Sequence, residues 1–125
     1  MPMSHGSRAE RSRAPLLLAL LTLLIFAGSL KMGFVNWDDH LYVYENSLVL
    51  HPSWAGCWRL LTGFYEHFYI PLVFLSYCAD SLVWQGKTWG FHLTNVLLHG
   101  ASGVLVFFIF RRLFGSALVA FAAAA

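Results

Sequence analysis

Two long uncharged stretches constrain this chain more than any other feature. Residues 15–30 are apolar and uncharged, and residues 32–35 extend this run beyond Lys31, whose long side chain can reach the membrane surface. Residues 93–110 form a second run that ends at Arg111. A helix needs roughly 20 residues to cross a bilayer, so we predict transmembrane helices at 15–34 and 92–112.

The composition agrees with a membrane protein and excludes other classes. Hydrophobic residues make up 58% of the 125 residues and charged residues 11%, against about 25% charged residues in soluble domains. A formal net charge of +2 offers no basic face for nucleic acid. Two cysteines are too few for a disulfide scaffold, and no Cys/His spacing indicates zinc.

Arginines flank both predicted helices and set the expected topology. Arg8, Arg11 and Arg13 lie in the polar tail of residues 1–14, and Arg111–Arg112 follow the second helix. Positive flanks face the cytoplasm, so residues 35–91 become an extracytoplasmic loop. Residues 113–125 add a cytoplasmic turn and the start of a third helix. The predicted fold is an all-α membrane protein with two transmembrane helices and part of a third.

Two alternatives concern the ends of the chain. The first helix also resembles a secretory signal, with Ala27-x-Ser29 as a small-residue cleavage site. We favour an uncleaved anchor because the chain stays hydrophobic past Ser29. The apolar run at residues 120–125 predicts an N-terminal piece of a longer polytopic protein, which we expect to be inactive alone.

The loop contains all five Trp and all five Tyr residues, together with five of the six acids. Aromatic rings with a polar edge prefer the headgroup level, so we expect the loop to lie on the outer membrane surface. We predict interfacial helices at about 54–64 and 71–85, the second begun by Pro71. Residues 68–84 are also apolar enough for a span, but this segment contains Asp80, which falls close to one helical stripe with Ser76 and the following Lys87.

The sharpest chemical feature is Asn36-Trp37-Asp38-Asp39-His40, directly after the first helix. Adjacent carboxylates repel each other, and this repulsion costs free energy, so the pair indicates that the carboxylates have a role. Asp38 or Asp39 is expected to cap the following helix, to lie in a solvated turn, or to serve a catalytic site. Their side chains point in different directions, so we expect different roles for the two.

A polar stripe also marks the second predicted transmembrane helix. His92, Asn95, His99 and Ser102 recur at spacings of three and four residues and share one face. Such a stripe either joins helices, helped by the small residues 100–103, or forms one wall of a polar cavity.

Cys57 and Cys78 both lie in the predicted extracytoplasmic loop. An oxidising compartment permits a disulfide between them. The sequence does not decide whether the two side chains meet.

The ordered motifs resemble the N-terminal part of GT-C type membrane glycosyltransferases. The resemblance is greatest to the protein O-mannosyltransferase-like group, which includes members with C-terminal tetratricopeptide repeats. The matching stretches, in order along the chain, are FVNWDDH at 34–40, YEN at 44–46, YIPL at 69–72 and GFHLTNVLLH at 90–99.

The resemblance implies transfer of a sugar from a polyprenyl-phosphate carrier on the non-cytoplasmic face, with Asp38 or Asp39 as the catalytic carboxylate. A general base suffices, because the phosphate leaving group needs no proton. Arg59, Lys87, a divalent metal or a residue beyond position 125 would hold the phosphate. The side chains that we expect to line the substrate cavity are Asn36, His40, Arg59, Tyr69, His92, Asn95 and His99.

The expected partners are a lipid-linked sugar donor and membrane lipids, with the acceptor unassigned and no nucleic acid. From the distribution of the family we expect the bacterial inner membrane. The alternative function is a small non-catalytic scaffold or assembly protein with an aromatic partner-binding loop. A transporter fragment fits less well, because the sequence shows no pair of broken helices.

Overall fold

The computed structural model describes the backbone of residues 8–125 and the side chains of residues 13–125. Residues 1–7 of the predicted cytoplasmic tail, and the side chains of Arg8 and Arg11, lie outside this part. The described residues form helices and turns without a strand, apart from one isolated bridge between Tyr65 and Phe68. The predicted all-α class is confirmed.

The chain folds as two compact units. The long-helix unit comprises residues 8–28 and Asn95–Ala125, and the aromatic unit comprises Ser29–Thr94. The three helices that contribute to the long-helix unit are α1 (Arg8–Phe26), most of α5 (Thr88–Phe114) and α6 (Ala117–Ala124). Segments 13–31 and 88–114 are long and apolar enough to cross a membrane.

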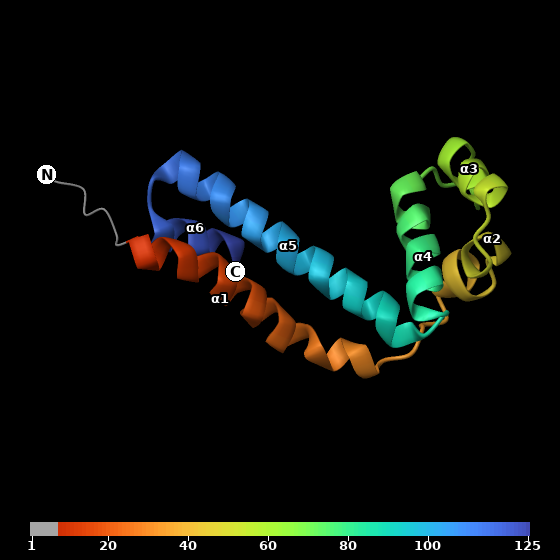
Figure 1. Cartoon of the computed structure of the whole chain (residues 1–125), viewed down its shortest axis with the longest axis horizontal. Coiled ribbons are helices and arrows are strands. Elements are labelled where there is room, and N and C mark those ends of the chain that lie inside the picture. The colour runs from red at the N-terminus through yellow and green to blue at the C-terminus, as the bar shows by residue number, and fades with distance from the viewer. Residues whose placement is uncertain (1–7) are drawn as a thin grey trace, which may run out of the picture. The chain divides into compact units, whose positions relative to one another are not determined.

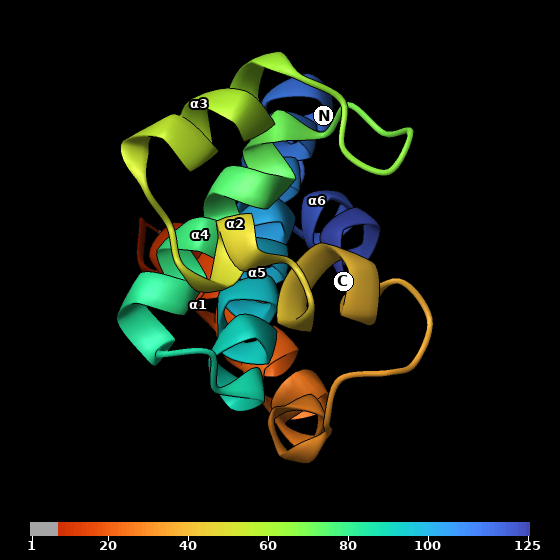
Figure 2. The ribbon, with the colours of Figure 1, turned by 90° about the vertical axis from the view of Figure 1, so that its right-hand side faces the viewer.

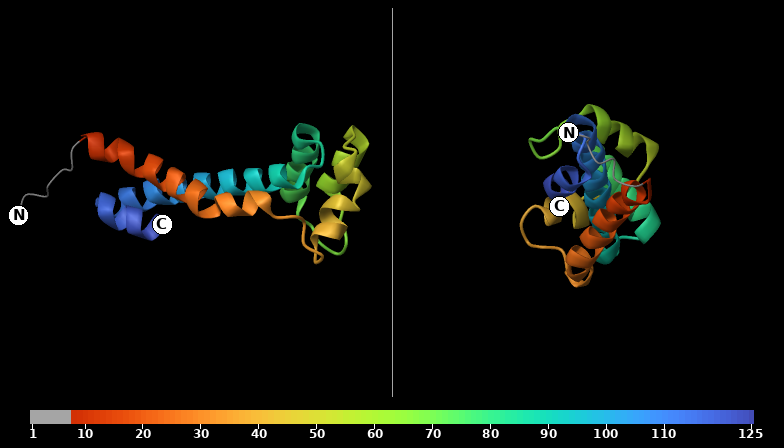
Figure 3. Two further views of the ribbon diagram at one scale, coloured as in Figure 1. Left: turned by 90° about the horizontal axis from the view of Figure 1, so that it is seen from below. Right: turned by 90° about the vertical axis from the view of Figure 1, so that its left-hand side faces the viewer.

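Small residues allow close helix packing in the long-helix unit. A Cβ added at Gly100 of α5 would lie 3.8 Å from the Thr22 side chain of α1. One added at Gly103 would lie 3.5 Å from the backbone oxygen of Ala124 at the end of α6. The helix α6 lies beside α1 (Figures 1 and 3). The buried core of this unit consists of Leu18, Phe107 and Ala120.

The helix ends differ from those predicted. α1 ends at Phe26 and continues as the 3-10 helix η1 (Ala27–Lys31), where Gly28 and Ser29 disfavour an α-helix, so the helical segment stops short of residue 34. α5 begins four residues before and ends two residues after the predicted helix 92–112. The turn expected before α6 is present, with Gly115 at a φ of 69°.

The aromatic unit is built from short, capped helices. Its elements are the π-helix η2 (His40–Tyr44), α2 (Ser47–Leu50), α3 (Trp54–Thr62) and α4 (Pro71–Trp84). Asn46 caps α2 by accepting the N–H of Leu48, and Ser53 caps α3 by accepting that of Gly56. Both α2 and α3 lie against α4 (Figures 1 and 2).

The expected orientation of α4 is wrong. The predicted polar stripe of Ser76, Asp80 and Lys87 does not form one wet face, because Asp80 is only 5% exposed. Phe74 and Cys78 share the buried side of α4 with Asp80. Apolar side chains are exposed instead, notably those of Leu72, Val73, Leu82 and Val83. The hydrogen bonds to the Asp80 carboxylate compensate its burial, so this acid does not have to face water.

Candidate functional site

The acidic pair lies at the entrance to an unusual helical turn. The backbone N–H of Glu45 donates to the carbonyl of His40 across 2.9 Å, which is the i→i+5 spacing of a π-helix. Such turns make up well under 1% of residues and occur often at functional sites. The π-helical turn η2 therefore marks the segment that follows Asp38 and Asp39 as a candidate site.

The two carboxylates have different surroundings. Asp39 accepts a hydrogen bond from the backbone N–H of Val35 at 2.8 Å, which closes the loop before η2. Asp39 occupies the N-cap position but makes no side-chain bond to the helix, so the capping interpretation is wrong for this residue. Asp38 is exposed, and no side-chain hydrogen bond to it is found in the described part of the chain.

Behind this loop lies an aromatic core formed by Phe34, Tyr42, Tyr65, Phe74, Tyr77 and Phe91. Phe74 is 1% exposed, and its ring meets those of Tyr42, Tyr65 and Tyr77 at centroid distances of 5.7, 5.2 and 6.5 Å. Phe91 of α5 joins the core through Tyr77 at 6.1 Å and Phe34 at 5.5 Å. Such pairs are each worth about 0.5–1.5 kcal/mol beyond burial. Residues from both ends of the unit thereby hold the acidic loop in place.

Two tyrosines of this core lie close to the acids. Burial raises the pKa of Tyr42, and the charges of Asp38 and Glu66 raise it further. Burial likewise raises the pKa of Tyr77, followed by the charge of Asp39 and then that of Asp80. Both phenols therefore stay protonated at neutral pH and can donate a hydrogen bond beside the carboxylates.

Asp80 forms a buried polar network with the start of α5. Its Oδ1 accepts a hydrogen bond from the Thr94 hydroxyl at 2.5 Å and another from the Trp84 indole N–H at 3.2 Å. Burial raises the pKa of Asp80 above its ordinary value, while the hydrogen bonds from Thr94 and Trp84 oppose that shift. This network ties α4 to α5 within the aromatic unit.

Two histidines offer unused polar atoms. His40 in η2 and His92 in α5 are half-buried. The Nδ1 of His40 and the Nε2 of His92 are buried with no hydrogen-bond partner among the described residues. A buried polar atom without a partner costs free energy, so each nitrogen is suited to bind a ligand or water.

The remaining expected cavity residues of the aromatic unit lie on its surface. Asn36 and Arg59 are exposed, and the charge of Arg59 acts on Tyr65, the neighbour of Glu66. Tyr69 is exposed and donates its hydroxyl to the carbonyl of Leu61 at 3.1 Å. Lys87, the other expected cation, is exposed in the turn between α4 and α5.

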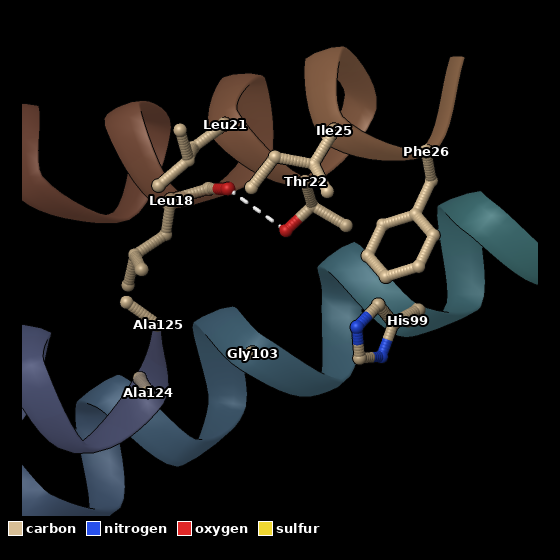
Figure 4. A pocket seen from close by; sticks show the side chains of 9 residues that line it. All are labelled: Leu18, Leu21, Thr22, Ile25, Phe26, His99, Gly103, Ala124 and Ala125. Atoms are coloured by element: carbon tan, nitrogen blue, oxygen red, sulfur yellow. Dashed lines mark hydrogen bonds between the residues drawn. The ribbon is translucent and has the colours of Figure 1, made fainter. Parts of the chain in front are cut away.

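Asn95 and His99 belong to the long-helix unit. His99 meets Phe26 of α1 edge-on at 5.1 Å. It lines a cavity of about 70 Å³ with mainly apolar neighbours from α1 and α6 (Figure 4). In the same cavity the Thr22 hydroxyl donates to the carbonyl of Leu18 at 3.0 Å (Figure 4). These contacts favour the interpretation of the stripe as a helix-packing surface.

A metal site is not assembled in the described part of the chain, where no three His, Cys, Asp or Glu side chains lie close enough to hold an ion. The expected divalent metal stays a prediction. We therefore assign no step of the chemistry to a metal.

Sequence reasoning missed the tyrosines and Asp80. Tyr42 and Tyr77 were regarded as members of a surface belt, and Asp80 as a wet residue. The available signal was the spacing of four between Asp80 and Trp84, which places an indole N–H beside the carboxylate on one helix face.

Comparison with known proteins gives one informative match. The chain is 29% identical over 110 residues to the mouse (Mus musculus) protein "Protein O-mannosyl-transferase TMTC4". The match covers 82% of this chain and 15% of that protein. The chain thus spans about 15% of the length of the curated relative that it matches. No family profile matches the chain, and no solved structure matches it.

Proposed function

We propose that this chain belongs to a membrane glycosyltransferase and supplies its first acidic loop. The similarity to a protein O-mannosyl-transferase and the two long apolar helices support this function. The observation on which the assignment of the base rests is the free carboxylate of Asp38, next to a π-helical turn and backed by the aromatic core.

The proposed donor is a sugar linked to a polyprenyl phosphate. Asp38 accepts the proton of an acceptor hydroxyl as that oxygen attacks the anomeric carbon. The bond from the anomeric carbon to the phosphate oxygen breaks, and the phosphate leaves as an anion that needs no proton. Asp39 positions the loop through Val35. The Tyr42 phenol, Arg59 and the open nitrogens of His40 and His92 are the groups that we assign to binding the sugar and phosphate.

We further propose that the aromatic unit is extracytoplasmic and lies at the headgroup level. Trp54 is 94% exposed, and Trp37, Trp58 and Phe64 are also exposed, together with the apolar side of α4. Lipid-linked sugars present their reacting atoms at this depth. The bacterial inner membrane stays our prediction for the membrane concerned. Labelling a cysteine at position 38 from the outside, in a Cys57→Ser/Cys78→Ser background, tests the topology.

The decisive experiment measures sugar transfer by the product of the complete reading frame from a polyprenyl-phosphate mannose donor. We expect Asp38→Asn to lower the rate by about 10²–10⁴-fold, the usual contribution of a general base. Glu45→Gln, which changes an exposed acid at the end of η2, is the matched control and should keep its activity. Full activity in both Asp38→Asn and Asp39→Asn would exclude the proposed base.

The exposed tryptophans also fit the second candidate, a non-catalytic scaffold whose aromatic loop binds a partner. A reading frame that continues into six or more further spans favours the transferase. A stop codon after Ala125 favours the scaffold.

A further inference from the structure

The two cysteines of the chain lie on helices that pack against each other. Cys57 is on α3 and Cys78 is on α4, 21 positions apart in the sequence. The helices α3 and α4 are in extensive contact within the aromatic unit. The structure therefore answers a question that the sequence leaves open, namely whether the two side chains can meet.

The two thiols are neighbours in the aromatic unit. The Cys78 side chain is buried in the core of the aromatic unit, and the half-buried Cys57 side chain packs against that core. Cys57 is the neighbour that, after burial, raises the pKa of Cys78, and the Cys78 thiol donates weakly to the carbonyl of Leu48 at 3.6 Å. Neighbouring thiols on two packed helices can approach the short Cβ–Cβ separation that a disulfide requires.

The two thiols differ in accessibility. Cys57 lines a hollow of about 310 Å³ together with Pro52, Ser53, Trp54 and Leu82, whereas Cys78 is only 3% exposed. An oxidant that enters this hollow reaches Cys57 first. Cys78 then lies behind it as the second thiol.

We propose that Cys57 and Cys78 form an intramolecular disulfide that joins α3 to α4 in an oxidising compartment. The oxidant is a second disulfide, either glutathione disulfide or that of an oxidoreductase. The Cys57 thiolate attacks one of its sulfurs, and the donor S–S bond breaks to release one thiolate. The Cys78 thiolate then attacks the Cys57 sulfur of the mixed disulfide and releases the second. The two protons lost by Cys57 and Cys78 pass to the released thiolates.

The second step depends on the Cys78 thiolate. Burial, and then the neighbouring Cys57, raise the pKa of Cys78 to about 12, so only a small fraction is thiolate at neutral pH. Because the thiolate is the nucleophile, ring closure accelerates about tenfold per pH unit below that pKa.

The closed ring would include the turn between α3 and α4, where Tyr65 and Phe68 form an isolated bridge. This ring, residues 57–78, includes Glu66 and His67, both with left-handed backbone conformations. Glu66 acts electrostatically on Tyr42, the same residue that Asp38 influences. The disulfide would therefore restrain the turn whose Glu66 charge acts on Tyr42. This consequence rests on the proposed function, whereas formation of the bond in the purified chain does not.

The test uses the full 125-residue chain in detergent micelles, incubated with glutathione disulfide at pH 7 and pH 8 and quenched with acid. Remaining thiols are alkylated after unfolding, and linked peptides are identified by mass spectrometry. We expect both thiols to disappear without dimer formation, about tenfold faster at pH 8. The Cys78→Ser control should stop at a Cys57–glutathione adduct. Two free thiols, or only adducts and dimers in the wild-type chain, would overturn the proposal.

The thiol state in cells separates this proposal from the topology. A disulfide that forms in the purified chain and also in cells supports both the pairing of the cysteines and the extracytoplasmic placement of the aromatic unit. If it forms in the purified chain but both thiols stay reduced in cells, the pairing holds and the extracytoplasmic placement is wrong.

Discussion

The two units of this chain bury different kinds of residue. The long-helix unit has a core of Leu18, Phe107 and Ala120, and many of its other large apolar side chains point outward. The aromatic unit buries a network of rings, a capping amide and a hydrogen-bonded carboxylate. The difference indicates that the stability of the long-helix unit depends on an apolar solvent, because its exposed leucines are favourable in lipid. The stability of the aromatic unit depends on packing within the unit.

The largest expected effect comes from removing the centre of the aromatic core. Phe74→Ala should lower the free energy of unfolding of the aromatic unit by about 3–5 kcal/mol, because the cavity is bordered by three aromatic rings that cannot collapse into it. Urea unfolding in micelles, followed by near-UV circular dichroism, measures this change. Leu105→Ala in the long-helix unit, at a side chain that is already exposed, should change stability little. Equal effects of the two substitutions would remove the contrast between the units.

Gly90→Ala should have the next largest effect. A Cβ at this position would overlap the Cβ and ring atoms of Trp84, so α4 and the start of α5 would have to separate. Overpacking of this kind costs about 1–3 kcal/mol, and it should also disturb the Trp84–Asp80 bond. Gly33→Ala is the matched control, since nothing lies within 4 Å of its added Cβ. Tryptophan fluorescence and thermal unfolding would detect the change, and wild-type stability of Gly90→Ala would contradict the geometry.

A helix cap from each unit permits a smaller, direct comparison. Asn46→Ala should lower stability by about 1–2 kcal/mol, because this buried amide caps α2. Ser116→Ala removes the cap of α6, whose bond to Val119 is longer at 3.4 Å and solvent-exposed, so about 0.5 kcal/mol is expected. Thermal unfolding of both variants measures the two losses of stability. A larger loss of stability in Ser116→Ala would show that caps contribute more to the stability of the long-helix unit.

The smallest expected effect is a pH dependence from Asp80. Burial raises its folded pKa, so between pH 3.8 and that higher value the folded chain binds more protons than the unfolded chain. The contribution of Asp80 to the free energy of unfolding is therefore complete below pH 3.8, and it is lost as the pH rises through the folded pKa. Asp80→Asn should remove this loss, while exposed Glu45→Gln should leave it unchanged. Parallel pH–stability curves for wild type and Asp80→Asn would contradict the assignment.

The sequence predicted the elements better than their orientations. The start of α4 at Pro71 and of α3 near Trp54 follow from local signals, since proline suits a first helical turn and Ser53 suits an N-cap. The wet face expected for Asp80 was wrong, because a partner 14 residues away, Thr94, satisfies the carboxylate. The candidate site shows the same division: the acidic pair is visible as a motif, but the neighbouring Tyr42 and Tyr77 are not.

The order of the residues alone determines much of the helical structure of this protein. Uninterrupted apolar runs and their lengths dictate α1 and α5, and small residues permit the close approach at Gly100. Which side of α4 is buried and whether the two cysteines are neighbours depend on groups far apart in the chain. Those outcomes required the folded arrangement, because hydrogen bonds and ring contacts between distant segments outweigh the preference of any single residue for water.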